Sequence, residues 1–239
     1  MAAGRRPATG RRSGPWRRWR PAKRRPEGGE EEGPLHVVLV HGFLDTGRLF
    51  RRFARRLSAG GHDAHCPTLS PRSGSLGIAD LSAKLEAFIG ERVPASSQLA
   101  LVGFSMGAIV ARHYLQCRGG ARRARAYFSI AGPHQGTLWA PLGPGQGARE
   151  LRRGSPFLRD LDRGLGALGG VPVRTYRAPL DLMVVPGSTT RLPGATEVVT
   201  WCPLHSLLPG DPAVMDDITA ALARVEGIAL GAAPKPAII

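Results

Sequence analysis

The chain has 239 residues, 42% of them hydrophobic, which is enough for one globular domain with a full core. Its formal net charge of +15 would ordinarily indicate a nucleic acid or an anionic membrane as partner, but ten of its 33 Lys and Arg lie within residues 1–26. The basicity is therefore largely a property of the N-terminal tail, and a nucleic-acid partner is not expected. Three cysteines without a CxxC pair argue against a disulfide framework, and no apolar run reaches the ~18 residues of a membrane span.

The two ends of the chain are predicted to lie outside the folded domain. Residues 1–33 are rich in Arg, Pro and Gly and cannot bury enough apolar surface to fold, so we expect them to be disordered. Trp16 and Trp19 stand among arginines there, which suits weak contact with a membrane surface, although a solvated tail is the simpler interpretation. No hydrophobic signal core follows, so a cytoplasmic protein is expected. The domain is predicted over 34–227, with a loose end at 228–239.

Strands and helices are predicted to alternate along this domain. Short apolar or β-branched runs indicate strands at 35–40, 62–66, 99–104, 126–131, 171–176 and 196–201. Apolar residues at helical spacing indicate helices near 49–57, 78–93, 106–118 and 212–225. Residues 138–170 interrupt the rhythm with Gly, Pro and basic residues and one short helix near 156–161. This order favours a mostly parallel α/β sheet with helices on both faces and no large cap domain.

A Gly-x-Ser-x-Gly pattern stands where the third strand passes into a helix. Small residues at Gly103 and Gly107 allow a sharp turn that holds Ser105 in a strained backbone conformation with its hydroxyl exposed. The pattern alone is weak evidence, because glycine and serine are common, but the flanking strand and helix are the context that it requires. The sequence therefore predicts Ser105 as a nucleophile.

A serine nucleophile needs an imidazole to take its proton and a carboxylate to orient that imidazole. In an open α/β sheet the reactive groups gather at the carboxyl ends of the strands. Asp181 follows the fifth predicted strand and His205 follows the last one, in the chain order Ser, Asp, His. We therefore expect a triad of Ser105, Asp181 and His205. The backbone N–H groups of Phe43 and Met106 are expected to form an oxyanion hole.

Other residues near the predicted site are candidates for contact with a substrate. His134 is as suited to the wall of a cleft as to an ordinary loop. Leu138 and Trp139 are candidates for an acyl-binding surface or a small lid, with local core packing as the alternative. His41 is interpreted as a structural histidine that shapes the loop before Phe43.

No cofactor or metal ion is expected. Cys202 and His205 supply only half of a zinc site, and no second pair is visible. Capping and solvation account for Asp211, Asp216 and Asp217, although their spacing would permit a calcium ion near the His205 loop.

A series of short motifs runs in order along the domain. They are His41-Gly42-Phe43, Gly103-Phe104-Ser105-Met106-Gly107, Gly132-Pro133-His134-Gln135-Gly136-Thr137, Leu180-Asp181, Leu192-Pro193-Gly194-Ala195 and His205. In this combination the chain resembles the α/β-hydrolase superfamily and, within it, the small bacterial class 2 triacylglycerol lipases and esterases. The resemblance implies a sheet of six to eight strands, no cofactor, and hydrolysis of a small-molecule ester or lipid by Ser105, Asp181 and His205.

Two alternatives stay open at this point. The same triad could serve a thioesterase or an acyltransferase, since only the leaving group and the acceptor differ. The chain could also be a binding module that keeps the fold without catalysing a reaction.

Overall fold

The centre of the molecule is a six-stranded parallel sheet in the order β2-β1-β3-β4-β5-β6. The computed structural model describes residues 34–225, so the predicted tail at 1–33 and the loose end at 228–239 lie outside the described residues. The strands are β1 (His36–Val40), β2 (Asp63–His65), β3 (Leu99–Phe104), β4 (Ala124–Ile130), β5 (Val173–Arg177) and β6 (Thr196–Val199). The predicted parallel α/β sheet is confirmed.

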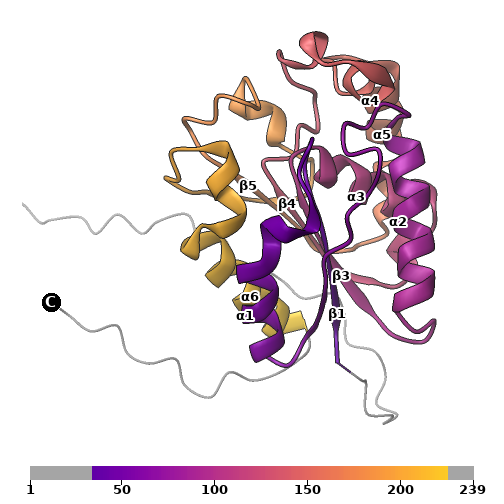
Figure 1. The fold of residues 1–239 in the computed structure, drawn as a ribbon, viewed down its shortest axis with the longest axis vertical. Helices are drawn as coiled ribbons and strands as arrows, with labels where there is room; N and C mark the ends of the chain where they lie inside the picture. Colours follow the sequence, from indigo (N-terminus) through magenta and orange to yellow (C-terminus); the bar gives the residue numbers. More distant parts are fainter. Residues whose placement is uncertain (1–33, 226–239) are drawn as a thin grey trace, which may run out of the picture.

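Helices cover both faces of this sheet, as Figure 1 shows. The longer ones are α1 (Arg51–Ala59), α2 (Ile78–Arg92), α3 (Met106–Cys117) and α6 (Pro212–Val225). Helices α1 and α6 pack on one face, and α2 and α3 pack on the other. Short 3₁₀ helices stand in the connections at η1 (Gly47–Phe50), η2 (Gly120–Arg122), η5 (Gly187–Thr190) and η6 (His205–Gly210).

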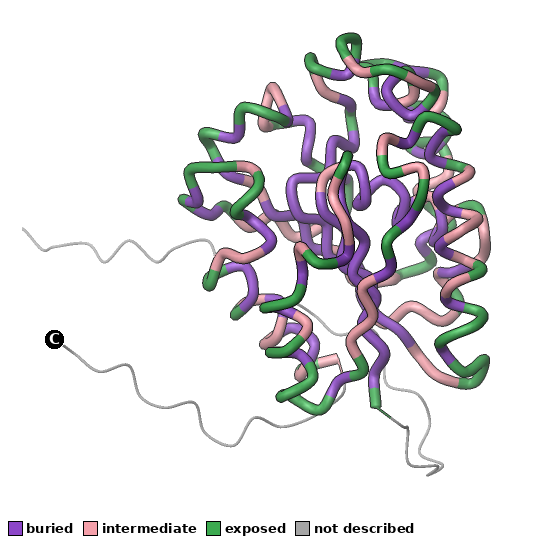
Figure 2. The backbone as a smooth tube through the Cα atoms, in the orientation of Figure 1, coloured by how far each residue is buried: buried purple, intermediate pink, exposed green. Residues whose placement is uncertain are grey.

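The two layers of helices enclose two apolar cores. Successive residues of a strand point to opposite faces of a sheet. In β1, Val37 and Leu39 therefore join the core under α1 and α6, while Val38 and Val40 join the core under α2 and α3. Figure 2 shows the result, with buried strands in the middle and exposed residues on the outer sides of the helices.

Between β4 and β5 the chain makes a helical excursion formed by η3 (Ala140–Leu142), α4 (Gly145–Glu150), α5 (Pro156–Arg163) and η4 (Leu165–Leu168). It adds no cap domain, because Leu158, Leu161 and Leu168 are buried in the same core as α2 and α3. Helix α5 matches the expected short helix. Helix α4 was not expected, since its sequence GQGARE has no apolar repeat.

Helix α4 is fastened to the loop that precedes α2. The N–H groups of Gln146 and Gly147 donate to the carbonyl oxygens of Ser75 and Gly74, both at 2.9 Å. The Glu150 carboxylate accepts from the first N–H of α2 at 2.6 Å. We call these joined segments, residues 71–77 and α4, the roof, because Gly74 lies against the Met106 sulfur at the start of α3.

The order of the strands places a topological switch point at the carboxyl ends of β1 and β3, and we call this position the crevice. The chain leaves β1 toward β2 on one side, and β3 pairs with β1 on the other side, so the connections after these two strands diverge. In open α/β sheets such a divergence is the usual place for a ligand. The loop that follows β1 and the turn at Ser105 therefore face each other across it.

Two glycines allow α3 to begin this close to the sheet. A methyl group on Gly107 would lie 2.3 Å from the carbonyl oxygens of Val40 and His41. A methyl group on Gly103 would lie 2.4 Å from the Ala108 Cα. Neither position has room for a side chain, which gives a physical reason for both glycines of the Gly-x-Ser-x-Gly pattern.

We predict that Gly107→Ala lowers the free energy of unfolding by about 3 kcal/mol, because the methyl group forces α3 away from β1. The matched control is Gly90→Ala in α2, where a methyl group would meet nothing within 4 Å. That change should stabilise the protein by up to about 1 kcal/mol through better helix propensity. Urea unfolding followed by circular dichroism measures both, and equal effects at the two positions would contradict the predicted clash.

Candidate active site

Ser105 occupies the turn between β3 and α3 in a backbone conformation that side chains rarely adopt. Its φ is 53° and its ψ is −123°, and its N–H donates to the Ile130 carbonyl oxygen at 2.8 Å. A non-glycine residue at positive φ is strained, and such strain collects at functional sites. The hydrogen bond to the end of β4 holds the turn in place, so the sheet itself maintains the strained conformation.

Asp181 and His205 come together at the carboxyl ends of β5 and β6. His205 Nδ1 lies 2.7 Å from Asp181 Oδ2. The other carboxylate oxygen, Oδ1, accepts the N–H groups of Met183 at 2.8 Å and Val184 at 3.0 Å. The Asp181 side chain is only 2% exposed, so these donors replace the water that it has lost.

The environment of Asp181 fixes the tautomer of His205. Burial alone would raise the pKa of this carboxyl group, but the hydrogen bond and charge interaction with His205, together with the N–H groups of Val184 and Met183, hold its pKa below the ordinary value. An ionised carboxylate only accepts hydrogen bonds. Nδ1 of His205 therefore carries a proton, and in the neutral imidazole Nε2 is the nitrogen with the lone pair.

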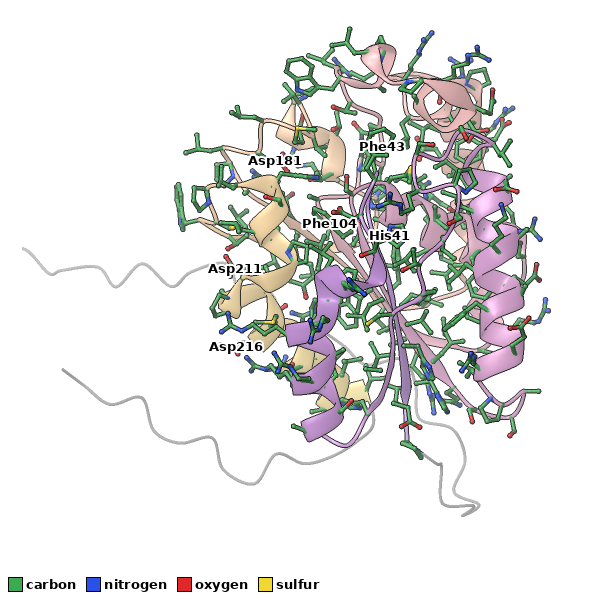
Figure 3. All side chains as sticks on the ribbon, in the orientation of Figure 1. His41, Phe43, Phe104, Asp181, Asp211 and Asp216 are labelled. Atoms are coloured by element: carbon green, nitrogen blue, oxygen red, sulfur yellow. The ribbon has the colours of Figure 1, made fainter. Side chains whose placement is uncertain are left out.

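The His205 ring packs against the residue before the serine, since the ring centroids of Phe104 and His205 are 4.7 Å apart. In Figure 3 the labelled Phe43, Phe104 and Asp181 lie toward the same end of the sheet. The Ser105 hydroxyl itself forms no hydrogen bond with any of residues 34–225. His205 was expected in a loop, whereas it is the first residue of η6.

The loop after β1 is shaped by His41. This ring is buried, and its Nε2 accepts the Leu69 N–H at 2.9 Å while its Nδ1 lies 2.9 Å from the Gly42 carbonyl oxygen. Burial lowers the pKa of His41, so the ring is neutral near pH 7 and fills both roles with one tautomer. The expected structural role of His41 agrees with these contacts.

The two expected oxyanion donors belong to the loop after β1 and to the first residue of α3. Met106 is the first residue of α3, so its N–H has no partner within the helix. The Phe43 N–H donates to no acceptor among residues 34–225. Both groups are thus available to an oxygen atom of a ligand, and the positive end of the α3 dipole adds to the Met106 side.

The structure removes His134 from the surface of the site. Its ring is 0% exposed, its Nε2 lies 2.8 Å from the Ser129 hydroxyl, and its edge meets the Tyr127 ring. The side chain therefore packs behind the site and offers no wall to a substrate. The sequence could not distinguish a His134 that lines a cleft from a buried one, because its burial depends on contacts with Ser129 and Tyr127 in the folded chain.

Leu138 and Trp139 are about half exposed, and their segment is joined to the loop that carries Asp181. The Trp139 indole N–H donates to the Leu182 carbonyl oxygen at 2.5 Å, and the Leu138 N–H donates to the Val185 carbonyl oxygen at 3.0 Å. We call this the acid-loop shelf, defined by Leu138, Trp139, Leu182 and Met183. The sequence did not indicate Leu182 or Met183, although both directly follow Asp181.

Large exposed apolar side chains gather at this end of the molecule. Among the described residues they all lie in β6 or in segments that follow strands: Phe43, Leu44, Leu76, Leu138, Trp139, Leu142, Leu180, Leu182, Met183, Val199, Trp201, Leu204 and Leu207. The outer faces of α1, α2, α3 and α6 carry none of these side chains. An apolar ligand therefore meets exposed apolar surface in the segments that follow the strands and not on the outer faces of these helices.

The three aspartates whose spacing would permit a calcium ion all have protein partners. Asp211 caps α6 through the Ala213 and Val214 N–H groups, Asp216 pairs with Arg56, and Asp217 holds Arg174 and the Tyr176 hydroxyl. No group of three or more His, Cys, Asp or Glu among residues 34–225 is arranged to hold a metal ion. Within the same residues, no helix is long and apolar enough to cross a membrane.

Comparison with known proteins matches the sequence to one family and the fold to many solved structures. The family model described as the alpha/beta hydrolase family matches residues 37–234. The mature lipase BlEst2 of Bacillus licheniformis superposes with a TM-score of 0.62 at 17% identity, over 83% of this chain and 93% of the lipase. Lipase B of Aspergillus fumigatus gives 0.62 at 18% identity, over 83% and 62% of the two chains.

A pyrethroid hydrolase from Sphingobium faniae JZ-2 gives a TM-score of 0.54 at 15% identity, over 82% of this chain and 98% of the hydrolase. No sequence among the curated proteins matches this chain. At these identities the structural similarities show the fold alone.

We predict that Asp181→Asn lowers the free energy of unfolding at pH 7 by about 1–3 kcal/mol, because a buried charged acceptor is lost. The pKa of Asp181 is lower in the folded than in the unfolded chain. Its carboxylate therefore stabilises the folded state at pH values above the ordinary carboxyl pKa of 3.8. This stabilisation disappears as the pH falls through the folded pKa, and the variant and the wild type should converge below about pH 4. Urea unfolding from pH 7 to pH 3 measures the difference. A gap that stays constant would contradict the argument.

Proposed function

The chain belongs to the alpha/beta hydrolase family, and on this premise we propose that it is a serine hydrolase that cleaves carboxylic esters through an acyl-enzyme on Ser105. The observation that carries the proposal is the 2.7 Å contact of His205 with the buried Asp181, beside a serine held at positive φ. A buried, ionised carboxylate on the Nδ1 side leaves Nε2 as a base toward the serine. Neither a purely structural loop nor a plain binding surface needs this arrangement.

The proposed reaction has two halves. In the first, His205 Nε2 takes the hydroxyl proton of Ser105 as the oxygen attacks the ester carbonyl, and the resulting imidazolium gives that proton to the departing alcohol. In the second half, His205 takes a proton from water, which attacks the acyl-serine, and returns it to Ser105 as the acid leaves. Asp181 stays ionised and steadies the imidazolium in both halves.

The negative charge that develops on the carbonyl oxygen would be met by the N–H groups of Phe43 and Met106. Both lack a protein acceptor in the described part of the chain, and both stand at the crevice. Donors that are already in place cost no reorganisation when the charge forms, which is why such groups contribute strongly to rate.

The apolar surroundings favour an ester with an apolar acyl chain. The acid-loop shelf presents Leu138, Trp139, Leu182 and Met183 next to Asp181, and no charged residue belongs to it. The similar structures named above include two lipases, which agrees with such a substrate. The two segments of the roof are joined by backbone hydrogen bonds, and the Glu150 carboxylate joins α4 to the first N–H of α2.

We predict that Ser105→Ala lowers the turnover of 4-nitrophenyl butyrate by on the order of 10⁴- to 10⁶-fold and abolishes labelling by a fluorophosphonate probe. Ser58→Ala is the control, because Ser58 is an exposed serine in the last turn of α1, which leads to the start of β2 and not to the carboxyl end of a strand. It should keep both activity and labelling. Unchanged turnover in Ser105→Ala would contradict the proposal, and faster cleavage of the matched thioester by the wild type would favour a thioesterase instead.

We further predict that Trp139→Ala reduces kcat/KM for an octanoate ester about tenfold while changing that for an acetate ester little, because only the longer chain reaches the acid-loop shelf. Trp201→Ala is the matched control. That tryptophan lines a groove of about 760 Å³ with Leu49 and Arg52, and no residue of the acid-loop shelf lines this groove. Equal losses of kcat/KM for both esters, or equal effects of the two variants, would contradict a role of the acid-loop shelf in binding the acyl chain.

A further inference from the structure

A carboxylate that the proposed mechanism does not use lies beside the nucleophile. From its position we propose that Asp45 is a specificity-determining residue that favours esters carrying a positive charge close to the scissile bond. This inference rests on the proposed ester hydrolysis at Ser105 and adds the class of substrate that the site prefers.

The contacts around Gly42 place Asp45 near Ser105. A methyl group on Gly42 would lie 3.2 Å from the Ser105 Cβ, 3.2 Å from Asp45 Oδ2 and 3.1 Å from the Phe104 ring. Because two of these distances share one point, Asp45 Oδ2 is at most about 6.4 Å from the Ser105 Cβ, twice 3.2 Å. Because Gly42 has no side chain, no side-chain atom of this residue lies between the carboxylate and the serine.

No protein group in the described part of the chain neutralises this carboxylate directly. Asp45 precedes the 3₁₀ helix η1, yet neither it nor the N-cap residue Thr46 caps that helix with its side chain. Among residues 34–225 the Asp45 carboxylate takes part in no ion pair and accepts no hydrogen bond. It is half-buried, so the charge is not fully shared with water.

Two basic groups come near the same loop without pairing with Asp45. The Arg72 guanidinium donates to the Leu44 carbonyl oxygen at 2.9 Å, and the His41 ring is neutral because burial lowers its pKa. The described residues carry 22 Lys and Arg against 13 Asp and Glu, which would repel a cation at long range. At physiological ionic strength, interactions between charges are screened beyond about 8 Å. The nearby carboxylate therefore contributes more to the electrostatic potential at Ser105 than the distant basic residues do.

The expected size of the effect follows from Coulomb's law. Two unit charges about 6 Å apart, at effective dielectric constants of about 20 to 80, interact strongly enough to change a rate constant by roughly three- to a hundredfold. The same carboxylate disfavours the anionic oxygen of the tetrahedral intermediate. A cation on the substrate offsets this repulsion, so charged esters should gain in kcat/KM and neutral esters should not.

The test compares isosteric esters that differ only in charge. In the first pair, butyrylcholine carries the positive charge in its alcohol part, and 3,3-dimethylbutyl butyrate is its neutral isostere. In the second pair, ethyl trimethylammonioacetate carries the positive charge in its acyl part, and ethyl 3,3-dimethylbutanoate is its neutral isostere. The kcat/KM ratio of charged to neutral ester is measured for the wild type, Asp45→Asn, Asp45→Glu and Asp160→Asn. Asp160 is an exposed acid on α5 paired with Arg163 and serves as the charge control.

We expect Asp45→Asn to lower the ratio about tenfold for at least one pair. Neutral esters should be cleaved as fast as by the wild type or faster, and Asp45→Glu and Asp160→Asn should keep the wild-type ratio. Raising NaCl from 0.05 to 0.5 M should lower the ratio in the wild type relative to the ratio in Asp45→Asn, because salt screens the attraction that only the wild type has.

Equal ratios in all four proteins would overturn the inference and leave the ester hydrolase standing. Loss of activity toward charged and neutral esters alike in Asp45→Asn would also overturn it, since Asp45 would then support the site as a whole. If the wild type cleaves none of the four esters, the proposed function fails and this inference fails with it.

Discussion

Helix α3 begins against the end of β1 at a distance that admits no side chain at Gly107, and the arrangement of the crevice depends on that contact. It aims the N-terminus of α3 at the loop after β1 and leaves Ser105 between them at positive φ. The strain of that turn is small against the two apolar cores that β1 and β3 help to fill. The packing of the sheet therefore maintains a backbone conformation that the local sequence would not adopt alone.

Asp181 and His205 are held in place by other contacts than those that hold Ser105. Asp181 is held mainly by N–H groups of its own loop, and that loop is joined to the segment after β4 through Trp139. His205 arrives from η6 and rests on Phe104, the last residue of β3. The proposed nucleophile thus belongs to the central strands, whereas the proposed acid and base belong to the sheet's later half. The contact between the Phe104 and His205 rings joins the two parts next to Ser105.

The sequence predicted what burial and periodicity control. Strands such as β3 and helices such as α6, with its Asp211 cap, follow from apolar spacing and capping. It predicted less where one loop meets another. His134 turned inward, and the place of Asp45 beside Ser105 depends on Gly42, because such contacts are set by the strand order and by no local pattern. Helix α4 has no apolar repeat, so only its bonds to the preceding loop reveal it.

The fastening of the roof also bears on how this protein can evolve. Gln146 holds the loop before α2 by its backbone N–H, which every residue except proline supplies. Gly147 does the same but has no room for a side chain, because a methyl group there would lie 2.6 Å from the Gly74 carbonyl oxygen. Glu150 is the one side chain in that set of contacts. Exposed side chains of the roof, such as Leu76, take no part in these hydrogen bonds. Mutations there can alter what the crevice accepts while the fold tolerates them, so a lineage could acquire new substrates by drift in the roof and the shelf.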